Sequence, residues 1–246
     1  MLGGLVPDLL CRTATRLLQG TTDVDVQLDL EIHGGATNCA RLERTLNDCD
    51  FTPDPEHVWR WREYSEPGRV VKVEFLADMD NVADYTTVTF DGCESLGARN
   101  LRGTGFAAQD WTLESFSSTI RNEPTVHLRV ATLPAYLLAK THAAHGRSLP
   151  KDWYDIAFVL LHNDAGGPTA AAQQVVARFG DDLGGATETA LGELSANFLD
   201  ADARGSVAYA RTMRSLHPDV DEDVLANDAV AAVCDFVTAL VSGERS

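Results

Sequence analysis

Two aspartates separated by one residue lie inside a β-branched stretch, and this stretch constrains the fold more than any other part of the chain. Its sequence is Gly20-Thr21-Thr22-Asp23-Val24-Asp25-Val26. Because side chains on a strand alternate between its two faces, Asp23 and Asp25 point to the same side of the predicted strand. Neighbouring carboxylates repel each other unless a cation lies between them. The pair is therefore a candidate Mg²⁺ site, and an acidic pattern on a solvated strand face is the alternative.

Composition limits the class of protein. The chain has 246 residues, of which 44% are hydrophobic and 23% charged, which suits one large soluble domain or two small ones. We expect no membrane span, since no apolar run reaches about 18 residues, and no secretory signal, since no basic n-region precedes an apolar core at the N-terminus. The five cysteines are an odd number without a Cys-x-x-Cys pair, which argues against a disulfide framework or a zinc site. These features predict a protein of the reducing cytoplasm.

The formal net charge of −17 predicts that the chain repels nucleic acid at long range. A local basic patch is then needed to hold an RNA end. The acidity also suits a cation-dependent site or a basic protein partner, and part of it serves solubility.

The hydrophobic pattern predicts a mixed α/β part followed by a helical part, with domains at 1–130 and 131–246. Irregular loops and short strands are expected between Asp78 and Arg121. The expected strands are Gln19–Ile32, Val58–Tyr64, Arg69–Ala77 and Val126–Val130, the second and third forming a hairpin, and the expected helices are Cys39–Leu46, Leu133–His145, Trp153–His162 and most of the chain beyond.

Two further features support a phosphate and metal site in the first part. Gly3 and Gly4 precede an apolar-periodic run, so they predict either a phosphate-binding turn at a helix start or an ordinary turn. Glu74 shares one strand face with Lys72, and a neighbouring strand would bring it to the aspartates. Three such carboxylates would hold two Mg²⁺ ions, as in enzymes that activate one oxygen and stabilise another. A solvated Lys72 and Glu74 face is the alternative.

One lysine of the second part needs a partner. Lys140 lies on an otherwise apolar helix, where a nucleotide phosphate or a carboxylate would compensate its charge, unless the side chain reaches the surface. Asp152 and Asp155 are three residues apart and share a helix face, although Asp152 is also placed to cap that helix.

The alternation Trp59-Arg60-Trp61-Arg62 has two interpretations. It would stack on and hold a nucleic-acid end. The more usual arrangement places the aromatics in the core and the arginines in water.

In order along the chain, these motifs resemble those of the AbiEii/MenT group of nucleotidyltransferase toxins from type IV-like toxin–antitoxin and abortive-infection systems. The motifs are Gly3-Gly4, Gly20-Thr21-Thr22-Asp23-Val24-Asp25, Val73-Glu74-Phe75-Leu76, Ala139-Lys140 and Lys151-Asp152-Trp153-Tyr154-Asp155. The resemblance covers roughly residues 3–160. It implies an α+β fold, namely a polymerase-β-like nucleotidyltransferase palm with a mixed sheet, followed by a helical C-terminal domain.

The resemblance also implies the chemistry. Nucleoside monophosphate would pass from an NTP to an acceptor hydroxyl, with an RNA such as a tRNA 3′ end as acceptor and a co-encoded antitoxin as a protein partner. The residues implied are Asp23, Asp25 and Glu74 for two Mg²⁺ ions and catalysis, Lys140, Asp152 and Asp155 as further catalytic residues, and Gly3, Gly4, Thr22 and Lys140 for the nucleotide. The chain departs from the family pattern in having Glu74 where Asp is usual and only Met1 and Leu2 before the glycines.

Two other functions remain open on the sequence. A nucleotidyltransferase for a small cationic acceptor of the aminoglycoside type would suit the acidic charge. A non-catalytic homologue would bind nucleotide or a protein partner without turnover.

Overall fold

The computed structural model describes residues 1–15, 23–28, 35–66, 69–117 and 124–243, and it divides into two compact units. Unit 1 comprises Met1–Leu5 and Thr21–Ala131, and unit 2 comprises Val6–Gly20 and Thr132–Ser246. The division after Ala131 lies one residue from the expected boundary. Each unit is described by itself.

The segment that begins at Val6 belongs to unit 2, whereas the sequence assigned it to the first domain. Helix α1 (Val6–Leu10) packs against α5 (Pro150–His162). The carboxylate of Asp164 accepts hydrogen bonds from the backbone N–H groups of Arg12 (3.1 Å) and Thr13 (3.0 Å). Hydrogen bonds from Thr13 lower the pKa of Asp164. These contacts join the N-terminal segment to the helices rather than to the sheet.

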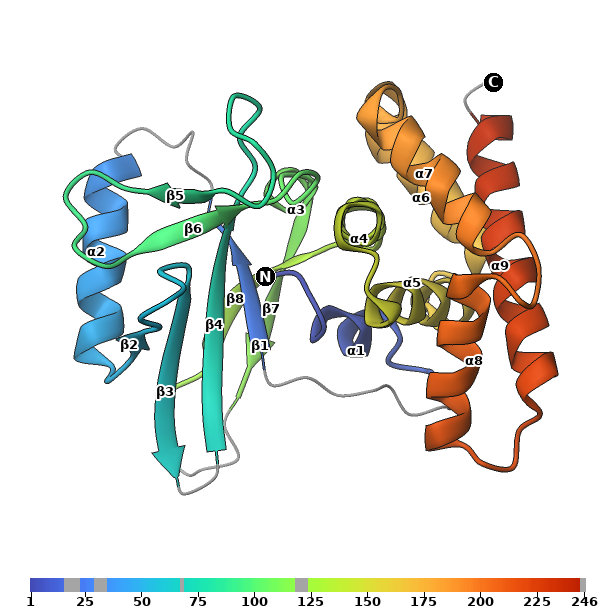
Figure 1. The fold of residues 1–246 in the computed structure, drawn as a ribbon, viewed down its shortest axis with the longest axis horizontal. Coiled ribbons are helices and arrows are strands. Elements are labelled where there is room, and N and C mark those ends of the chain that lie inside the picture. The colour runs from blue at the N-terminus through green and yellow to red at the C-terminus, as the bar shows by residue number, and fades with distance from the viewer. Residues whose placement is uncertain (16–22, 29–34, 67–68, 118–123, 244–246) are drawn as a thin grey trace. The chain divides into compact units, whose positions relative to one another are not determined.

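A mixed sheet built around β4 (Arg69–Ala77) forms most of unit 1 (Figure 1). One edge of β4 pairs in parallel with β1 (Asp23–Gln27). The other edge pairs antiparallel with β3 (Arg60–Glu66) and then in parallel with β6 (Gly97–Asn100). The remaining strands of this sheet are β2 (Thr52–Pro53), beside β3, and β5 (Thr87–Thr89), beside β6.

Helix α2 (Gly35–Asp48) and one face of the sheet share a hydrophobic core. Its fully or nearly fully buried members include Trp61, Phe75 and Ala98. Glu43 of α2 is also buried, and its carboxylate accepts the backbone N–H groups of Glu94 (2.9 Å) and Leu96 (2.7 Å). The core occupies this face of the sheet around Trp61 and Phe75, so the polar side chains of β1, β3 and β4 lie on the opposite face.

A two-stranded ribbon completes unit 1. It consists of β7 (Trp111–Phe116) and β8 (Val126–Ala131), paired antiparallel and preceded by the short helix α3 (Phe106–Gln109). The Arg129 guanidinium lies 4.2 Å from the centre of the Trp111 ring.

Helices form all of unit 2. Helix α5 lies at its centre, because every residue from Asp152 to Leu160 is buried and because α5 packs against α4, α8 and α9. Proline occupies the first turn of α4, α5 and α6, where its missing N–H costs nothing. The other helices are α4 (Leu133–Arg147), α6 (Pro168–Phe179), the 3₁₀ turn Gly180–Asp182, α7 (Ala186–Asn197), α8 (Arg204–Leu216) and α9 (Glu222–Gly243).

Helix α9 is the one helix of the described residues that is long and apolar enough to cross a membrane by length and composition alone. Core helices of soluble proteins pass the same test. The buried residues of α9, such as Leu225 and Phe236, face α6 and α8, whereas Asn227, Asp228 and Asp235 are exposed. This distribution is that of an amphipathic helix in a helical bundle.

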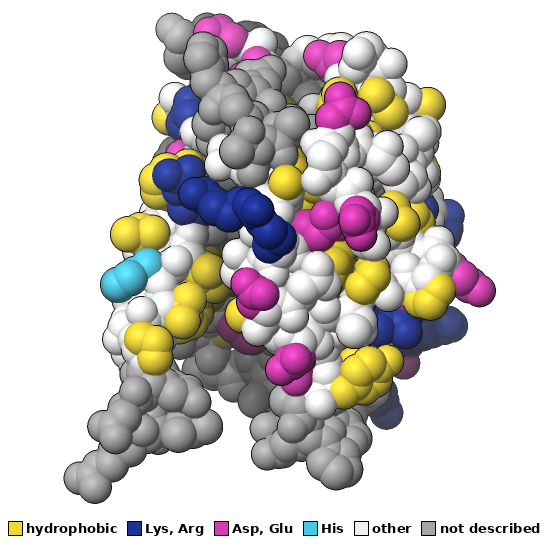
Figure 2. Space-filling model, turned by 90° about the vertical axis from the view of Figure 1, so that its left-hand side faces the viewer, with side chains coloured by type: hydrophobic (Ala, Val, Ile, Leu, Met, Phe, Trp, Pro, Cys, Tyr) yellow, Lys and Arg dark blue, Asp and Glu magenta, His cyan; other side chains and the backbone are white. Residues whose placement is uncertain are grey.

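Acidic side chains do not gather in a single patch on the face drawn in Figure 2. Lys and Arg side chains adjoin one another there, and Asp, Glu and hydrophobic side chains are scattered between and around them (Figure 2). The net charge of −17 is therefore not expressed as one continuous acidic surface on this side.

The coarse prediction of a mixed sheet followed by helices is confirmed. The expected strand Arg69–Ala77 agrees with β4, and Val126–Val130 agrees with β8 to one residue. Strand β1 is shorter than the expected Gln19–Ile32 within the described residues, and α2 is longer at both ends than the expected Cys39–Leu46.

Candidate active site

The open face of the sheet carries three columns of polar side chains, one on each of three adjacent strands. Register pairs Asp25 with Glu74 across β1 and β4, and Glu74 with Arg60 across β4 and β3. Because β1 and β3 lie on opposite edges of β4, the row runs Asp25, Glu74, Arg60. A second row, two residues earlier along β4, runs Asp23, Lys72, Arg62. Residues two apart share a face, so both rows lie on the same side of the sheet.

This arrangement separates charge across the sheet. The β1 column is acidic, the β4 column is mixed and the β3 column is basic. The Lys72 ammonium lies 3.3 Å from Asp23 Oδ1, and both side chains are about one-third exposed (34% and 38%). The face is therefore open to a ligand while each column stays partly neutralised by its neighbour.

Gly3 lies directly against the acidic column. The backbone N–H of Leu2 donates to the carbonyl of Asp25 at 3.0 Å, which forms an antiparallel bridge. Gly3 has φ of +90°, and a Cβ built on it would lie 1.8 Å from Asp25 Oδ2. Only glycine allows both the left-handed turn and this close approach. The structure thus brings the predicted glycine turn and the predicted Asp25 together, and Gly4 follows in the same turn.

Glu74 shares the face with the aspartates, and its carboxylate is paired with an arginine. Arg60 Nε donates to Glu74 Oε1 at 2.7 Å, so the nearest cation to this carboxylate is a guanidinium. No group of three His, Cys, Asp or Glu side chains suited to a metal ion occurs in the described part of the chain. Asp23, Asp25 and Glu74 remain the predicted ligands, with Glu74 opposite Asp25 and one of its oxygens bound by Arg60. Two carboxylates with substrate phosphates are a normal Mg²⁺ environment.

Sequence reasoning missed the role of Arg60, which it treated as one of two arginines in water. Trp59 and Trp61 are buried, as that interpretation expected. Arg60 and Arg62, however, are only about 30% exposed and bind Glu74 and Asp54. Predicted Thr22 lies outside the described residues.

The second predicted constellation is assembled within unit 2. The Lys140 ammonium lies 2.9 Å from Asp152 Oδ1 and 2.8 Å from Asp155 Oδ2. Arg147 donates from Nε and Nη2 to the two oxygens of Asp152 at 2.7 and 2.8 Å, and Lys151 donates to Asp155 at about 3.0 Å. Of the alternatives open for Lys140, the carboxylate partner is the one observed.

Local backbone geometry produces this cluster. Helix α4 ends at Arg147, and Ser148 adopts a left-handed conformation (φ 49°) that terminates it. Pro150 then begins α5, which places Asp152 in its first turn and Asp155 three residues later on the same side. Asp152 makes no side-chain cap to the helix; its two oxygens are taken by Arg147 and Lys140.

Burial and the charged partners act in opposite directions on the pKa values of Lys140 and Asp152. Lys140 and both aspartates are nearly inaccessible, with side-chain exposures of 8%, 2% and 1%. Desolvation alone would lower the pKa of Lys140, but Asp155 and Asp152 outweigh it, so the pKa is raised above 10.5. For Asp152, burial opposes ionisation, yet Lys140 and Arg147 lower its pKa below 3.8.

The sign of the pH dependence follows from these shifts. The contribution of Asp152 to stability is complete above its unfolded pKa of 3.8 and is lost as the pH falls through the lowered value. The contribution of Lys140 is complete below 10.5 and is lost as the pH rises through the raised value. Lys140 and Asp152 are therefore both charged at neutral pH.

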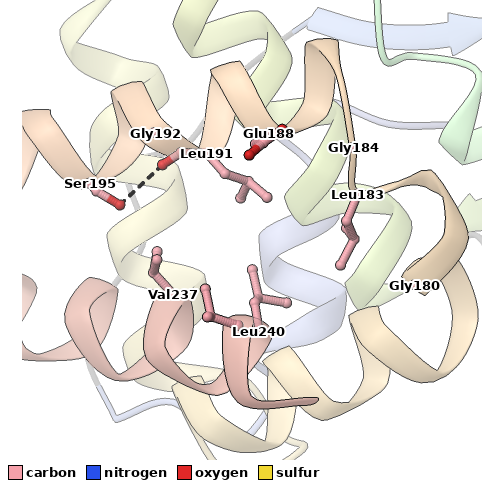
Figure 3. Close-up of a pocket in the computed structure, with 10 residues that line it drawn as sticks. Gly180, Leu183, Gly184, Glu188, Leu191, Gly192, Ser195, Val237 and Leu240 are labelled. Carbon is pink, nitrogen blue, oxygen red and sulfur yellow. Dashed lines mark hydrogen bonds between the residues drawn. The ribbon is translucent and has the colours of Figure 1, made fainter. Parts of the chain in front are cut away.

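A separate cavity of about 540 Å³ lies in unit 2 and contains none of the predicted site residues. Leu183, Leu191, Val237 and Leu240 project into it from the loop before α7, from α7 and from α9 (Figure 3). Glu188 and Ser195 add polar atoms, and the Ser195 hydroxyl donates to the Leu191 carbonyl at 3.1 Å. Its lining is mainly apolar.

Comparison with known proteins gives one match. The family model described as "Nucleotidyl transferase AbiEii toxin, Type IV TA system" matches residues 101–235, which is 135 of the 246 residues. Lys140, Asp152 and Asp155 lie inside the matched region, whereas Gly3, the β1 aspartates and Glu74 lie before it. Neither the curated proteins nor the solved structures yielded a match.

Gly3→Ala should lower the free energy of unfolding more than Gly92→Ala. Both glycines have positive φ, but a Cβ on Gly92 meets nothing within 4 Å, whereas on Gly3 it overlaps Asp25. Gly92→Ala thus measures backbone strain alone, on the order of 1 kcal/mol, and the excess for Gly3→Ala measures the contact. Urea unfolding of both variants provides the comparison. Equal losses would mean that Gly3 does not adjoin Asp25.

Lys140→Met should destabilise the chain by about 3–5 kcal/mol, because it leaves two buried carboxylates without their shared cation. Lys151→Met is the matched control, since Lys151 contacts the same Asp155 but is 37% exposed. The control should cost at most about 1 kcal/mol. Thermal and urea unfolding at pH 7 measure both. A loss of the same small size for both variants would contradict the buried cluster.

Proposed function

Because the matched region exceeds half of its length, the chain belongs to the AbiEii family of nucleotidyltransferase toxins of type IV toxin–antitoxin systems, and we propose that it transfers a nucleoside monophosphate from an NTP to an RNA hydroxyl. Pyrophosphate is the leaving group. Membership of this family also implies a nucleotide substrate and a cognate antitoxin.

The close contact of Gly3 with Asp25 is the observation that supports this proposal most strongly. A ligand lying beside Asp23 and Asp25 also lies beside the backbone of the Gly3-Gly4 turn. Glycine backbone allows a phosphate to approach closely, and carboxylates bind Mg²⁺, so the two parts suit the phosphates and the cation of one NTP–Mg²⁺ complex. In this proposal Asp23 and Asp25 hold Mg²⁺, and Gly3 and Gly4 donate N–H groups to the β- and γ-phosphates.

Mg²⁺, when bound, would neutralise charge on the phosphates and polarise the α-phosphate. The protein groups do the rest. The acceptor hydroxyl gives its proton to the Glu74 carboxylate as its oxygen bonds to the α-phosphorus, and the bond from that phosphorus to the pyrophosphate oxygen breaks. Arg60, bound to Glu74 Oε1, orients the carboxylate. A second Mg²⁺ at Glu74, as in two-metal enzymes, would be held through the carboxylate oxygen that Arg60 does not bind.

Lys140 receives a different role from the phosphate contact that the resemblance implied. Its ammonium already has two carboxylate partners, so we propose that Lys140 positions Asp152 and Asp155 and holds α4 to α5. Arg147 and Lys151 are the cations of this cluster that reach solvent, with exposures of 38% and 37%. A phosphate near the cluster would meet these two side chains first.

We place the reaction in the cytoplasm, where NTPs and RNA are both available. All five cysteines are free thiols, and Cys11 and Cys39 are buried. Burial raises the pKa of Cys11 to about 12, so this thiol is inert. Free thiols suit a reducing compartment.

Asp25→Asn should abolish Mg²⁺-dependent transfer of label from an α-labelled NTP to total RNA, because it removes a charge from the cation site while keeping the side-chain size. Asp80→Asn is the control, since Asp80 is 99% exposed and pairs with Arg102 on the surface of the same unit. The control should retain wild-type transfer. Each of the four NTPs is tested with purified protein, and the labelled product is identified on a denaturing gel.

Several outcomes separate the proposal from its alternatives. Equal labelling by the wild type and Asp25→Asn would reject the metal site. Label on an aminoglycoside but not on RNA would identify a small-molecule transferase. Mg²⁺-dependent NTP binding by calorimetry without pyrophosphate release would identify a non-catalytic nucleotide-binding protein.

A further inference from the structure

Arg99 extends the basic column of the open sheet face. Strand β6 continues the edge of β4 that β3 occupies, and Arg99 pairs with Leu76, two residues beyond Glu74. Residues two apart on β4 share a face, so Arg99 lies on the same side of the sheet as Glu74. The basic column along this edge is therefore Arg62, Arg60 and Arg99.

Arg99 differs from the other two arginines in its partners. Arg62 binds Asp54 and Arg60 binds Glu74. The Arg99 guanidinium instead lies 5.1 Å from the ring centre of Trp59 and 5.1 Å from that of Tyr85. Its Nε is buried without a hydrogen-bond acceptor, and none of the carboxylates in the described residues pairs with it.

The aromatic contacts fix the guanidinium without neutralising it. Cation–π contacts contribute roughly 0.5–2 kcal/mol and act on the faces of the guanidinium, so they do not use the N–H groups of its two terminal nitrogens. Trp59 is only 9% exposed, so one of the two rings that contact Arg99 belongs to the protein interior. A fixed, unneutralised guanidinium in a chain of net charge −17 is suited to bind an anion, and its planar fork matches a phosphate.

The position of Arg99 on the sheet indicates whether it would bind a phosphate of the NTP or a phosphate of the acceptor. Gly3 and the β1 aspartates lie on one side of Glu74, and the basic column lies on the other. If the NTP occupies the β1 side, the acceptor must approach Glu74 from the β3 and β6 side. We propose that Arg99, held by Trp59 and Tyr85, binds a backbone phosphate of the single-stranded RNA acceptor. This inference rests on the proposed function, because the NTP defines which side of Glu74 is free.

The same geometry explains how an acidic protein binds RNA. At long range the net charge repels a polyanion. Local attraction then has to come from a few fixed cations, and only Arg99 among the three arginines of the column keeps its charge unpaired by a carboxylate of the described residues.

Arg99→Gln tests the proposal, with Arg102→Gln as the matched control. Arg102 is three residues further along the chain and pairs with exposed Asp80, so both variants lose one positive charge from the same unit. Binding of a short fluorescein-labelled single-stranded RNA to the full chain is measured by anisotropy over a range of salt concentrations. Arg99→Gln should weaken binding about tenfold and reduce the slope of log K against log salt by about 0.7, as expected for one lost phosphate contact. Arg102→Gln should change neither.

Steady-state transfer assays provide the second readout. Arg99→Gln should raise the KM for RNA and leave the KM for the NTP unchanged. Unchanged RNA affinity in Arg99→Gln, an equal loss in Arg102→Gln, or a raised KM for the NTP alone would overturn the proposal. The absence of RNA binding by the wild type would also overturn it.

Two controls keep the result interpretable. Should Arg99→Gln fail to fold, Arg99→Lys is compared with Arg102→Lys, since lysine keeps the charge but loses the planar fork. The proposal expects Arg99→Lys to bind RNA more weakly than the wild type, with a nearly unchanged salt slope. Arg102→Lys should bind RNA as the wild type does. If Asp25→Asn retains transfer, the proposed function fails, while the RNA-binding comparison still decides the role of Arg99.

Discussion

The pairing register of β4 with its two neighbours is the constraint on which the candidate active site depends. On one edge β1 brings Asp25 opposite Glu74, and on the other β3 brings Arg60 opposite the same residue. A slip of one residue on either edge would turn the partner into the core that α2 covers. The hydrophobic side therefore specifies the polar side: Trp61 and Phe75 can be buried only when Arg60 and Glu74 face outward.

Unit 2 contains a buried cluster of ionisable side chains. Lys140, Asp152 and Asp155 are buried at the junction of α4 and α5, and each has ion-pair partners at hydrogen-bond distance. Such clusters add little net stability compared with apolar packing but are costly to break. Lys140, Asp152 and Asp155 lie inside the region 101–235 that matches the AbiEii family model, whereas the polar residues of β1, β3 and β4 lie before it.

Much of this could be predicted from the sequence, and the failures have physical causes. The period-2 pattern identified β4. The sequence also indicated that Lys140 needs a partner, but it left a nucleotide phosphate and a carboxylate open as that partner. Arg60 was missed because a register shift between Glu63 and Glu66 changes which residue of β3 faces Glu74. A regular register, counted residue by residue from the Glu66–Arg69 pair at the turn between β3 and β4, would have paired Glu74 with Trp61. The assignment of the segment from Val6 to unit 2 depends on contacts with Asp164, far along the chain, which no local pattern reveals.

Paramagnetic broadening by Mn²⁺, used in place of Mg²⁺ with an NTP present, tests the central claim most directly. At substoichiometric Mn²⁺, the account predicts that amide signals of Gly3, of β1 and of β4 near Glu74 broaden first, and that Asp25→Asn removes this broadening. Broadening centred on Asp152 and Asp155, or spread evenly over the acidic surface, would contradict a cation site formed by Asp23 and Asp25.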